Sequence, residues 1–156
     1  GKLAEGKRKI AYEVLFVMDS SPRIGVRARI VPEMSKEEVA GFLALAWRCR
    51  AMKSYVVRTI EGLIRHVYQP GEERIGRSYM GRRLPLDYDR PLIELRGEKS
   101  KLVIEGLRWA GVPEFTGPVI HGQGVFLCWL DGVPRNLRAG QRSELAFWMS
   151  VLPVER

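Results

Sequence analysis

The chain has 156 residues, of which 46% are hydrophobic and 28% are charged. Because this length matches one average domain and this composition is ordinary for globular proteins, two independent cores, wholesale disorder and low-complexity sequence are excluded. The formal charge of +8 and the pI of about 9.9 favour a polyanionic partner but say nothing about topology. We therefore expect one domain over residues 1–156 that binds a polyanion.

The chain starts with a basic segment, residues 1–9, which we interpret as an N-terminal arm. Its basic residues include Lys7, Arg8 and Lys9. The short apolar run Ile10–Met18 follows, but Glu13 interrupts it and no small-residue cleavage site comes after it, so we do not expect a secretory signal peptide. We also expect no membrane span, because no stretch approaches the roughly 20 apolar residues that cross a bilayer.

The segment 24–30 has the pattern of a half-buried strand. Apolar residues at every second position alternate with Gly25, Arg27 and Arg29, which predicts two guanidinium groups on the wet face of a strand. The run 10–18 could pair with this strand, yet its apolar residues also fit one face of a helix. The sequence leaves residues 10–31 open between strand and helix.

A long helix is predicted from Ser35 to Tyr68. Ser35 and Glu38 fit a capping box, in which the serine caps the helix and the glutamate reaches back to it. Apolar residues then recur every three or four positions with no proline between them. These residues are Phe42, Ala46, Cys49, Met52, Val56, Ile60, Leu63 and Val67. A helix of about 33 residues would be about 50 Å long, wider than a compact domain of this size, so we expect it to be interrupted or to protrude.

Residues 69–96 lack periodicity and are rich in glycine and proline, which predicts a long irregular connection. Such loops are commonly functional. We expect a second helix over 98–109, a hairpin within 118–130 and a last helix over 139–152. The predicted fold is therefore mainly α, a helical bundle with one long basic helix and one or two short β-hairpins.

No catalytic constellation stands out in the sequence. The two histidines, His66 and His121, are far apart, and no zinc, triad or P-loop motif is present. We interpret Cys49 and Cys128 as small core residues and predict neither a bound metal nor a cofactor.

The strongest enzymatic alternative is a Mg²⁺-dependent nuclease, or an accessory subunit of one, with Asp87 and Asp89 as metal ligands. In an extended Asp-Tyr-Asp segment both carboxylates would lie on one side, as metal-assisted phosphoryl chemistry requires. Arg82, Arg83 and Arg90 flank the two acids, so neutralising these arginines is the simpler role for the same carboxylates.

The strongest positive signal is the charge of the long helix. Between Glu38 and Glu61 it carries basic residues and no acidic one, and its basic face lies opposite the apolar stripe. A solvated helix face is the plain alternative, although the acidic residues that normally support such a face are missing. Trp47 on this face would suit stacking on a sugar or base, or a contact with another subunit. The predicted nucleic-acid-binding residues are Lys7, Arg8, Lys9, Arg48, Arg50, Lys53, Arg58, Arg65, Arg82 and Arg83.

Nineteen of the 26 basic residues are arginine, and the chain contains a single asparagine. An Arg-rich, Asn-poor chain with a basic N-terminal segment and a long helix, Ser35–Tyr68, that is basic on one face resembles the helical capsid proteins of filamentous viruses that infect hyperthermophilic archaea. The resemblance covers the first half of the chain. It implies dimers or pseudo-dimers of mainly α-helical subunits that wrap double-stranded DNA, hold it in A-form and stack into a filament, without enzymatic activity. It also implies two sets of residues with different roles. The phosphate clamp would consist of Arg48, Arg50, Arg58 and Arg65. Subunit packing would involve Trp47 and Trp148.

We therefore expect a structural protein that coats or packages double-stranded DNA without sequence specificity. Its location would be the virion or the host cytoplasm, and its partners would be copies of itself or a homologous subunit. No motif for sequence-specific recognition is present. The alternatives are the nuclease described above and a ribonucleoprotein component that coats RNA, and the sequence does not choose between DNA and RNA.

Overall fold

The structure is a computed structural model that describes residues 2–5, 8–39, 42–48, 52–69, 82–83, 85–121, 124–131 and 134–154. These residues form strands joined by turns, and no helix occurs among them. The prediction of a mainly α helical bundle is therefore wrong. No helix long and apolar enough to cross a membrane is found in the described part of the chain.

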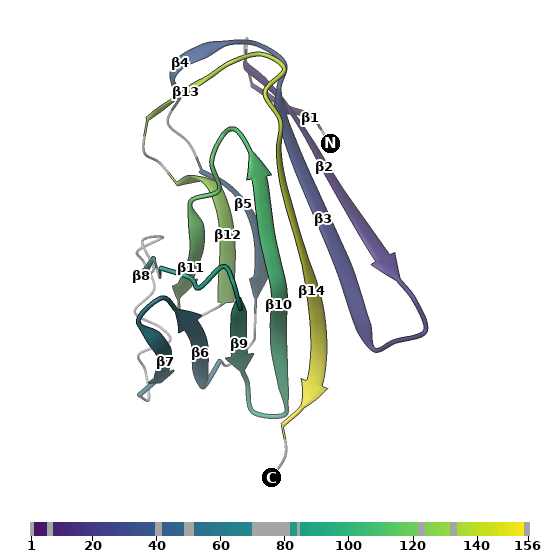
Figure 1. The fold of residues 1–156 in the computed structure, drawn as a ribbon, viewed down its shortest axis with the longest axis vertical. Coiled ribbons are helices and arrows are strands. Elements are labelled where there is room, and N and C mark those ends of the chain that lie inside the picture. The colour runs from purple at the N-terminus through teal and green to yellow at the C-terminus, as the bar shows by residue number, and fades with distance from the viewer. Residues whose placement is uncertain are drawn as a thin grey trace.

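Most of the described strands belong to two antiparallel sheets. The large sheet contains, in spatial order, β1 (Lys2–Glu5), β2 (Arg8–Met18), β3 (Arg23–Pro32), β14 (Ser143–Pro153), β10 (Ser100–Gly111), β9 (Leu92–Arg96), β6 (Ser54–Thr59) and β7 (Gly62–Val67). The small sheet contains β5 (Phe42–Arg48), β12 (Gly124–Asp131), β11 (Gly117–His121) and β8 (Arg82–Arg83). A short ribbon pairs β13 (Arg135–Leu137) with β4 (Lys36–Val39). The long strands β2, β3, β14 and β10 run along the longest axis of the molecule (Figure 1).

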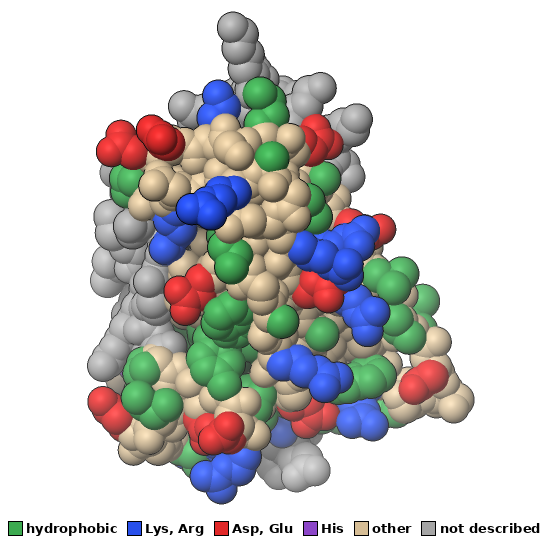
Figure 2. Space-filling view, turned by 45° about the horizontal axis from the view of Figure 1, so that its top comes forward, with side chains coloured by type: hydrophobic (Ala, Val, Ile, Leu, Met, Phe, Trp, Pro, Cys, Tyr) green, Lys and Arg blue, Asp and Glu red, His purple; other side chains and the backbone are tan. Residues whose placement is uncertain are grey.

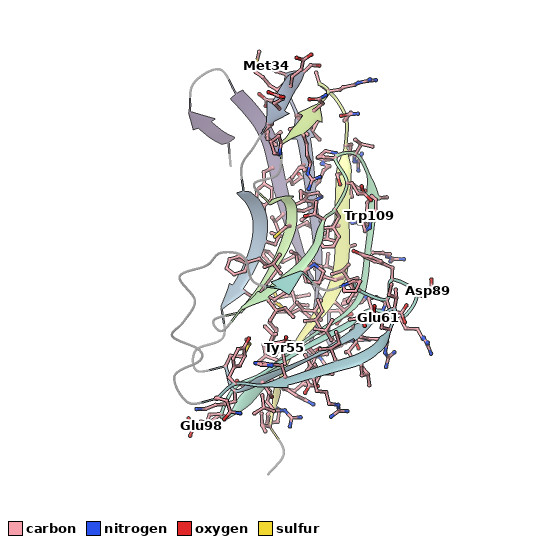
Figure 3. All side chains as sticks on the ribbon, turned by 90° about the vertical axis from the view of Figure 1, so that its left-hand side faces the viewer. Met34, Tyr55, Glu61, Asp89, Glu98 and Trp109 are labelled. Atoms are coloured by element: carbon pink, nitrogen blue, oxygen red, sulfur yellow. The ribbon has the colours of Figure 1, made fainter. Side chains whose placement is uncertain are left out.

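The hydrophobic core lies between the two sheets, which Figure 3 shows from the side. Every second residue of β3 and β14 points inward, as Val26 and Ala28 do on β3 and Leu145 and Phe147 on β14. On the small sheet Trp129 is fully buried, and its indole N–H donates a hydrogen bond of 2.9 Å to a serine hydroxyl at the start of β14. The period of two thus determines which face of each strand is apolar.

The described part of the range predicted as the long helix contains four strands, β4 to β7. The hydroxyl of Ser35 accepts a hydrogen bond from the backbone N–H of Ala139 (2.9 Å), so it joins two loops and caps no helix. Gly62 adopts a φ of +125°, which suits the turn between β6 and β7 and is incompatible with a helix interior. The Tyr-Val-Val-Arg-Thr stretch of β6 is rich in the β-branched and aromatic residues that favour strands.

The two other predicted helices are also strands. Residues 98–109 contribute to β10, in which a β-bulge between Glu105 and Arg108 shifts the register. The bulge separates the inward residues Ile104 and Leu107 by three positions, and this spacing imitates that of a helix. Residues 139–152 include most of β14, where every second residue from Ser143 to Met149 is buried.

Other predictions agree with the structure. The hairpin expected within 118–130 is present as β11 and β12. Residues 10–31, which the sequence left open between strand and helix, contribute to the β2–β3 hairpin. Cys128 is buried, as expected for a small core residue, whereas Cys49 lies outside the described residues.

The expected N-terminal arm and the expected irregular connection both include strands. Lys2–Glu5 forms β1 and pairs with residues 8–11 of β2. Within 69–96, the last residues form β9, and Leu86 is buried and forms a bridge with Thr59. Residues 70–81 and residue 84 lie outside the described part of the chain.

Candidate anion-binding site

The outer face of the large sheet, which is the side turned away from the small sheet, carries most of the described basic side chains. Because Val26 and Ala28 of β3 point into the core, their neighbours Arg27 and Arg29 point outward. The basic residues of this face are Arg23, Arg27, Arg29, Arg58, Arg65, Arg96, Lys101, Arg108 and Arg142. The acidic residues are Glu13, Glu94, Glu105 and Glu144. Figure 2 shows part of this face, where Lys and Arg side chains gather beside an apolar area.

Strand register aligns two arginines across the centre of the outer face. Arg27 on β3 and Arg108 on β10 both pair with Ala146 of β14, which lies between them. Since neighbouring strands are about 4.8 Å apart, the two side chains start about 10 Å from each other. We call these three residues the Arg27–Ala146–Arg108 row.

Trp148 occupies the next outward position on β14, beside this row. Small residues flank it, because Gly25 of β3 lies opposite it and Gly106 lies in the bulge of β10. A Cβ atom on Gly25 would be 3.1 Å from Cζ3 of the indole, and one on Gly106 would be 3.5 Å from Cδ1. The guanidinium carbon of Arg23 lies 5.4 Å from the ring centroid, within the range of a cation–π contact. The two glycines therefore give the ring room to lie close to the sheet.

The row and the indole border a shallow depression of about 250 Å³. It is lined by Leu15 and Val17 from β2 as well as by Arg27, Arg108 and Trp148. Adjoining depressions of about 200 Å³ and 270 Å³ are also lined by Arg27, the second one also by Arg108. Arg27 is thus accessible from several sides of the same basic area.

Three other arginines of this area are held by carboxylates. Nη2 of Arg29 lies 2.5 Å from Oε2 of Glu13 on β2, and Nη1 of Arg23 lies 3.4 Å from Oε1 of Glu105 on β10. Nε of Arg142 donates to Oε1 of Glu144 at 2.9 Å.

Arg27 and Arg108, by contrast, are exposed and make no ion pair or side-chain hydrogen bond with any residue that the structure describes. The row therefore offers two guanidinium groups that no described residue engages by an ion pair or a hydrogen bond.

The lowered pKa of Glu144 reflects the positive charges around it on the outer face. It is lowered from its ordinary value, chiefly by the hydrogen bond from Arg142 and further by the charges of Arg142, Arg27 and Arg29. The carboxylate consequently stays ionised at neutral pH. An incoming anion would feel the same arginines, and guanidinium groups bind phosphate oxygens in a bidentate manner.

The structure distributes the residues predicted from the long helix over two sheets. Arg58 on β6 and Arg65 on β7 are outward neighbours on the outer face, but they lie at the opposite edge of the large sheet from Arg27. Lys53 is exposed just before β6. Arg48 ends β5 of the small sheet, where its backbone pairs with Gly124. These residues therefore form no single clamp.

The remaining predicted residues lie elsewhere. Arg8 and Lys9 are in β2, and Arg82 and Arg83 form β8 of the small sheet. Lys7 and Arg50 fall outside the described residues.

The two predicted packing residues differ in their surroundings. Trp47 is half-buried and packs edge-on against Phe147 with ring centroids 5.3 Å apart, so it extends the core. Trp148 lies on the outer face, at the depression described above.

The sequence pattern placed Arg27 on a wet strand face but did not single it out as a site residue. Arg108 was missed because it lies in a segment predicted to be helical. The outward glycines beside an outward tryptophan are a signal only once the register between β3, β14 and β10 is known.

Asp87 has a structural role in the described geometry. Its Oδ1 accepts hydrogen bonds from the backbone N–H groups of Asp89 (3.0 Å) and Arg90 (3.3 Å), and its Oδ2 is 3.8 Å from Nε of Arg90. These contacts shape the turn that leads into β9. No group of three or more His, Cys, Asp or Glu residues that could hold a metal occurs among the described residues.

Comparison of the chain with protein-family models, with curated proteins and with solved structures found no match. The resemblance to capsid proteins of filamentous viruses depended on a long helix over Ser35–Tyr68, and the described part of this range forms strands.

Proposed function

We propose that this protein binds nucleic acid by holding the phosphodiester backbone on the outer face of its large sheet, without recognising base sequence. The observation that carries the proposal is the Arg27–Ala146–Arg108 row, in which two exposed guanidinium groups have no described protein partner. A polyphosphate gives such groups the acceptors they lack. No catalytic step is part of the proposal.

The chemistry of the row favours phosphate over a carboxylate-bearing small molecule. The depression is shallow and open, so it encloses no compact ligand, whereas a backbone that crosses the sheet can meet several arginines in turn. Contacts of this kind position the ligand and carry no sequence information.

Trp148 adds a contact that depends on strandedness. An aromatic ring beside arginines can stack on an unpaired base, and such stacking contributes about 1–3 kcal/mol per base. A duplex offers no such base, so it would use the arginines alone. Double-stranded DNA is the ligand we expected from the sequence, and it is the first probe to test; a single strand of the same length then measures the contribution of Trp148.

The test is fluorescence anisotropy with labelled DNA duplexes of two unrelated sequences. Wild-type protein should bind both with equal affinity. Replacing both arginines, Arg27→Ala with Arg108→Ala, should weaken binding about tenfold or more at low salt and reduce the slope of log affinity against log salt by about two, because two phosphate contacts are lost.

The matched control removes the same charge elsewhere. Arg138→Ala with Lys99→Ala changes two exposed basic residues that lie in turns away from the row. This variant should keep the wild-type slope. Equal losses in both variants would show that only net charge matters and would contradict the proposed site.

Assembly on DNA is a separate part of the expected role. If the protein coats or packages duplex DNA, negative-stain microscopy of the mixture should show regular filaments or coated strands. Discrete complexes of one protein on one duplex would limit the role to binding.

A further inference from the structure

Part of the edge of β2 is free. β1 pairs only with residues 8–11 of β2, so among the described residues the stretch Tyr12–Met18 is hydrogen-bonded to β3 alone. The other edge of this stretch presents backbone N–H and C=O groups that can pair with another strand.

This free stretch is apolar on both faces of the sheet. Leu15 and Val17 are 52% and 48% exposed on the outer face, and Phe16 and Met18 are 55% and 76% exposed on the inner face. Val14 still packs against the core, but the core does not extend to the two residues that follow it on the inner face. The β2–β3 hairpin leans away from the rest of the molecule (Figure 1).

Exposure on both faces distinguishes this stretch from the usual edge of a sheet. Natural sheets protect edge strands with lysine, proline or a bulge, and residues 14–18 contain none of these. Four consecutive exposed apolar side chains beside unpaired backbone groups mark a surface that is covered by a partner.

We propose that a second copy of this chain covers it, by antiparallel pairing of β2 with β2 around a two-fold axis at Phe16. The argument is the register. With the axis at Phe16, the ring meets that of the second copy, Leu15 lies opposite Val17, and Val14 lies opposite Met18. Opposite residues share a face, so apolar side chains meet apolar side chains on both faces.

Other symmetric registers match less well. Opposite residues lie on the same face whenever the axis passes through a residue, so the next registers centre on Leu15 or Val17. The first places Glu13 opposite Val17, and the second places Leu15 opposite Asp19. In the proposed register Glu13 lies opposite Asp19 outside the apolar window, and Glu13 is already bridged by Arg29.

The pairing extends the large sheet across both copies. A two-fold axis perpendicular to the sheet keeps the outer faces on the same side, so the arginine rows of both copies would face one ligand. The dimer stands on the edge and the register alone and does not depend on the proposed nucleic-acid binding.

The test is the mass in solution, measured by light scattering during size-exclusion chromatography of the full chain. Wild-type protein should be a dimer of the 17.8 kDa chain at micromolar concentration. Phe16→Glu should raise the dimer dissociation constant on the order of 100-fold or more, because two like charges would meet in an apolar seam. Ile60→Glu, at an exposed apolar residue in the turn between β6 and β7, is the control and should leave the dimer intact.

A mixing experiment tests the register itself. Phe16→Lys should also be monomeric, and mixing it with Phe16→Glu should restore dimers, since opposite charges would then meet at the axis. Circular dichroism shows whether each variant is folded, which is expected because Phe16 is more than half exposed. A monomeric wild type, a dimeric Phe16→Glu variant, or no recovery on mixing would each overturn the proposal. A monomer that instead co-floats with phosphatidylcholine vesicles would overturn it and assign the hairpin to a membrane surface.

Discussion

Removing one carboxylate from the outer face should strengthen nucleic-acid binding. Glu144 pairs with Arg142 and lies in the field of Arg27 and Arg29, which lower its pKa. Glu144→Gln keeps the shape of the side chain, releases Arg142 and raises the net charge of the face by one. A gain of affinity on removing a side chain is expected only if the ligand and Glu144 compete for the same arginines.

The size of the expected gain in affinity follows from how exposed the side chains of Arg142 and Glu144 are. The two side chains are 56% and 34% exposed, so solvent screens their interaction. A unit charge about 4 Å from a phosphate in water is worth about 1 kcal/mol, which corresponds to about fivefold in affinity. If the released Arg142 contacts one more phosphate, the salt slope should become steeper by about 0.9.

The assay is anisotropy of a labelled DNA duplex at several salt concentrations. The control is Glu98→Gln, which makes the same change of charge at the turn between β9 and β10, at the opposite end of the molecule from Met34 (Figure 3). It should leave the affinity within about twofold of wild type. The reasoning is refuted if both variants bind alike or if Glu144→Gln binds more weakly than wild type.

Glu144→Gln should also change how the free energy of unfolding depends on pH. A carboxyl whose folded pKa is lowered stabilises the protein above its unfolded pKa of about 4.3, and this contribution is lost as the pH falls through the folded value. Solvent screening keeps the contribution below about 1 kcal/mol. Wild type and Glu144→Gln should therefore differ slightly in free energy of unfolding at pH 7 and converge in acid; a difference that grows in acid would contradict the assignment.

Two further predictions concern the scaffold, and urea unfolding measures both. Ser143→Ala should lower the free energy of unfolding by about 1–3 kcal/mol, because it leaves the buried indole N–H of Trp129 without its acceptor. A loss below about 0.5 kcal/mol would contradict this prediction. Gly111→Ala should cost about 3 kcal/mol, because a Cβ there would lie 1.9 Å from the carbonyl oxygen of Arg142 at a φ of +93°. Gly140→Ala, with a φ of +76° and open space, is its control and should cost only about 1 kcal/mol; equal losses would refute the clash.

The sequence predicted strands where alternation was unambiguous. Between Ile24 and Ile30 the period of two indicates a strand with Arg27 on its wet face, although the sequence leaves residues 10–31 open between strand and helix; the structure has the strand. The glycine-bounded run that forms β11 and β12 was likewise predicted as a hairpin.

The sequence misled where two periods coexist. Val56, Ile60, Leu63 and Val67 have helical spacing, yet the residues of β6 that face the core are Tyr55, Val57 and Thr59. Spacing alone cannot decide such a case, whereas the β-branched residues of β6 favour a strand and Gly62 favours a turn. In β10 the bulge at Gly106 changes the phase of the alternation, and no local pattern announces a bulge.

The candidate site could not be assembled from the sequence for a different reason. Arg27 and Arg108 are far apart in the chain and become neighbours only because β14 lies between β3 and β10. The register of three strands is a long-range property set by the packing of the whole sheet. Composition predicted that arginines would bind an anion, but it could not say which arginines share a surface.

The most direct test of the account observes the arginine side chains themselves. NMR signals of the Nε–Hε groups, assigned through Arg27→Lys and Arg108→Lys variants, can be followed while a short DNA duplex is added. The account predicts that the signals of Arg27 and Arg108 shift first and furthest, before that of Arg138. Unchanged signals for both residues while the duplex binds elsewhere on the protein would contradict it.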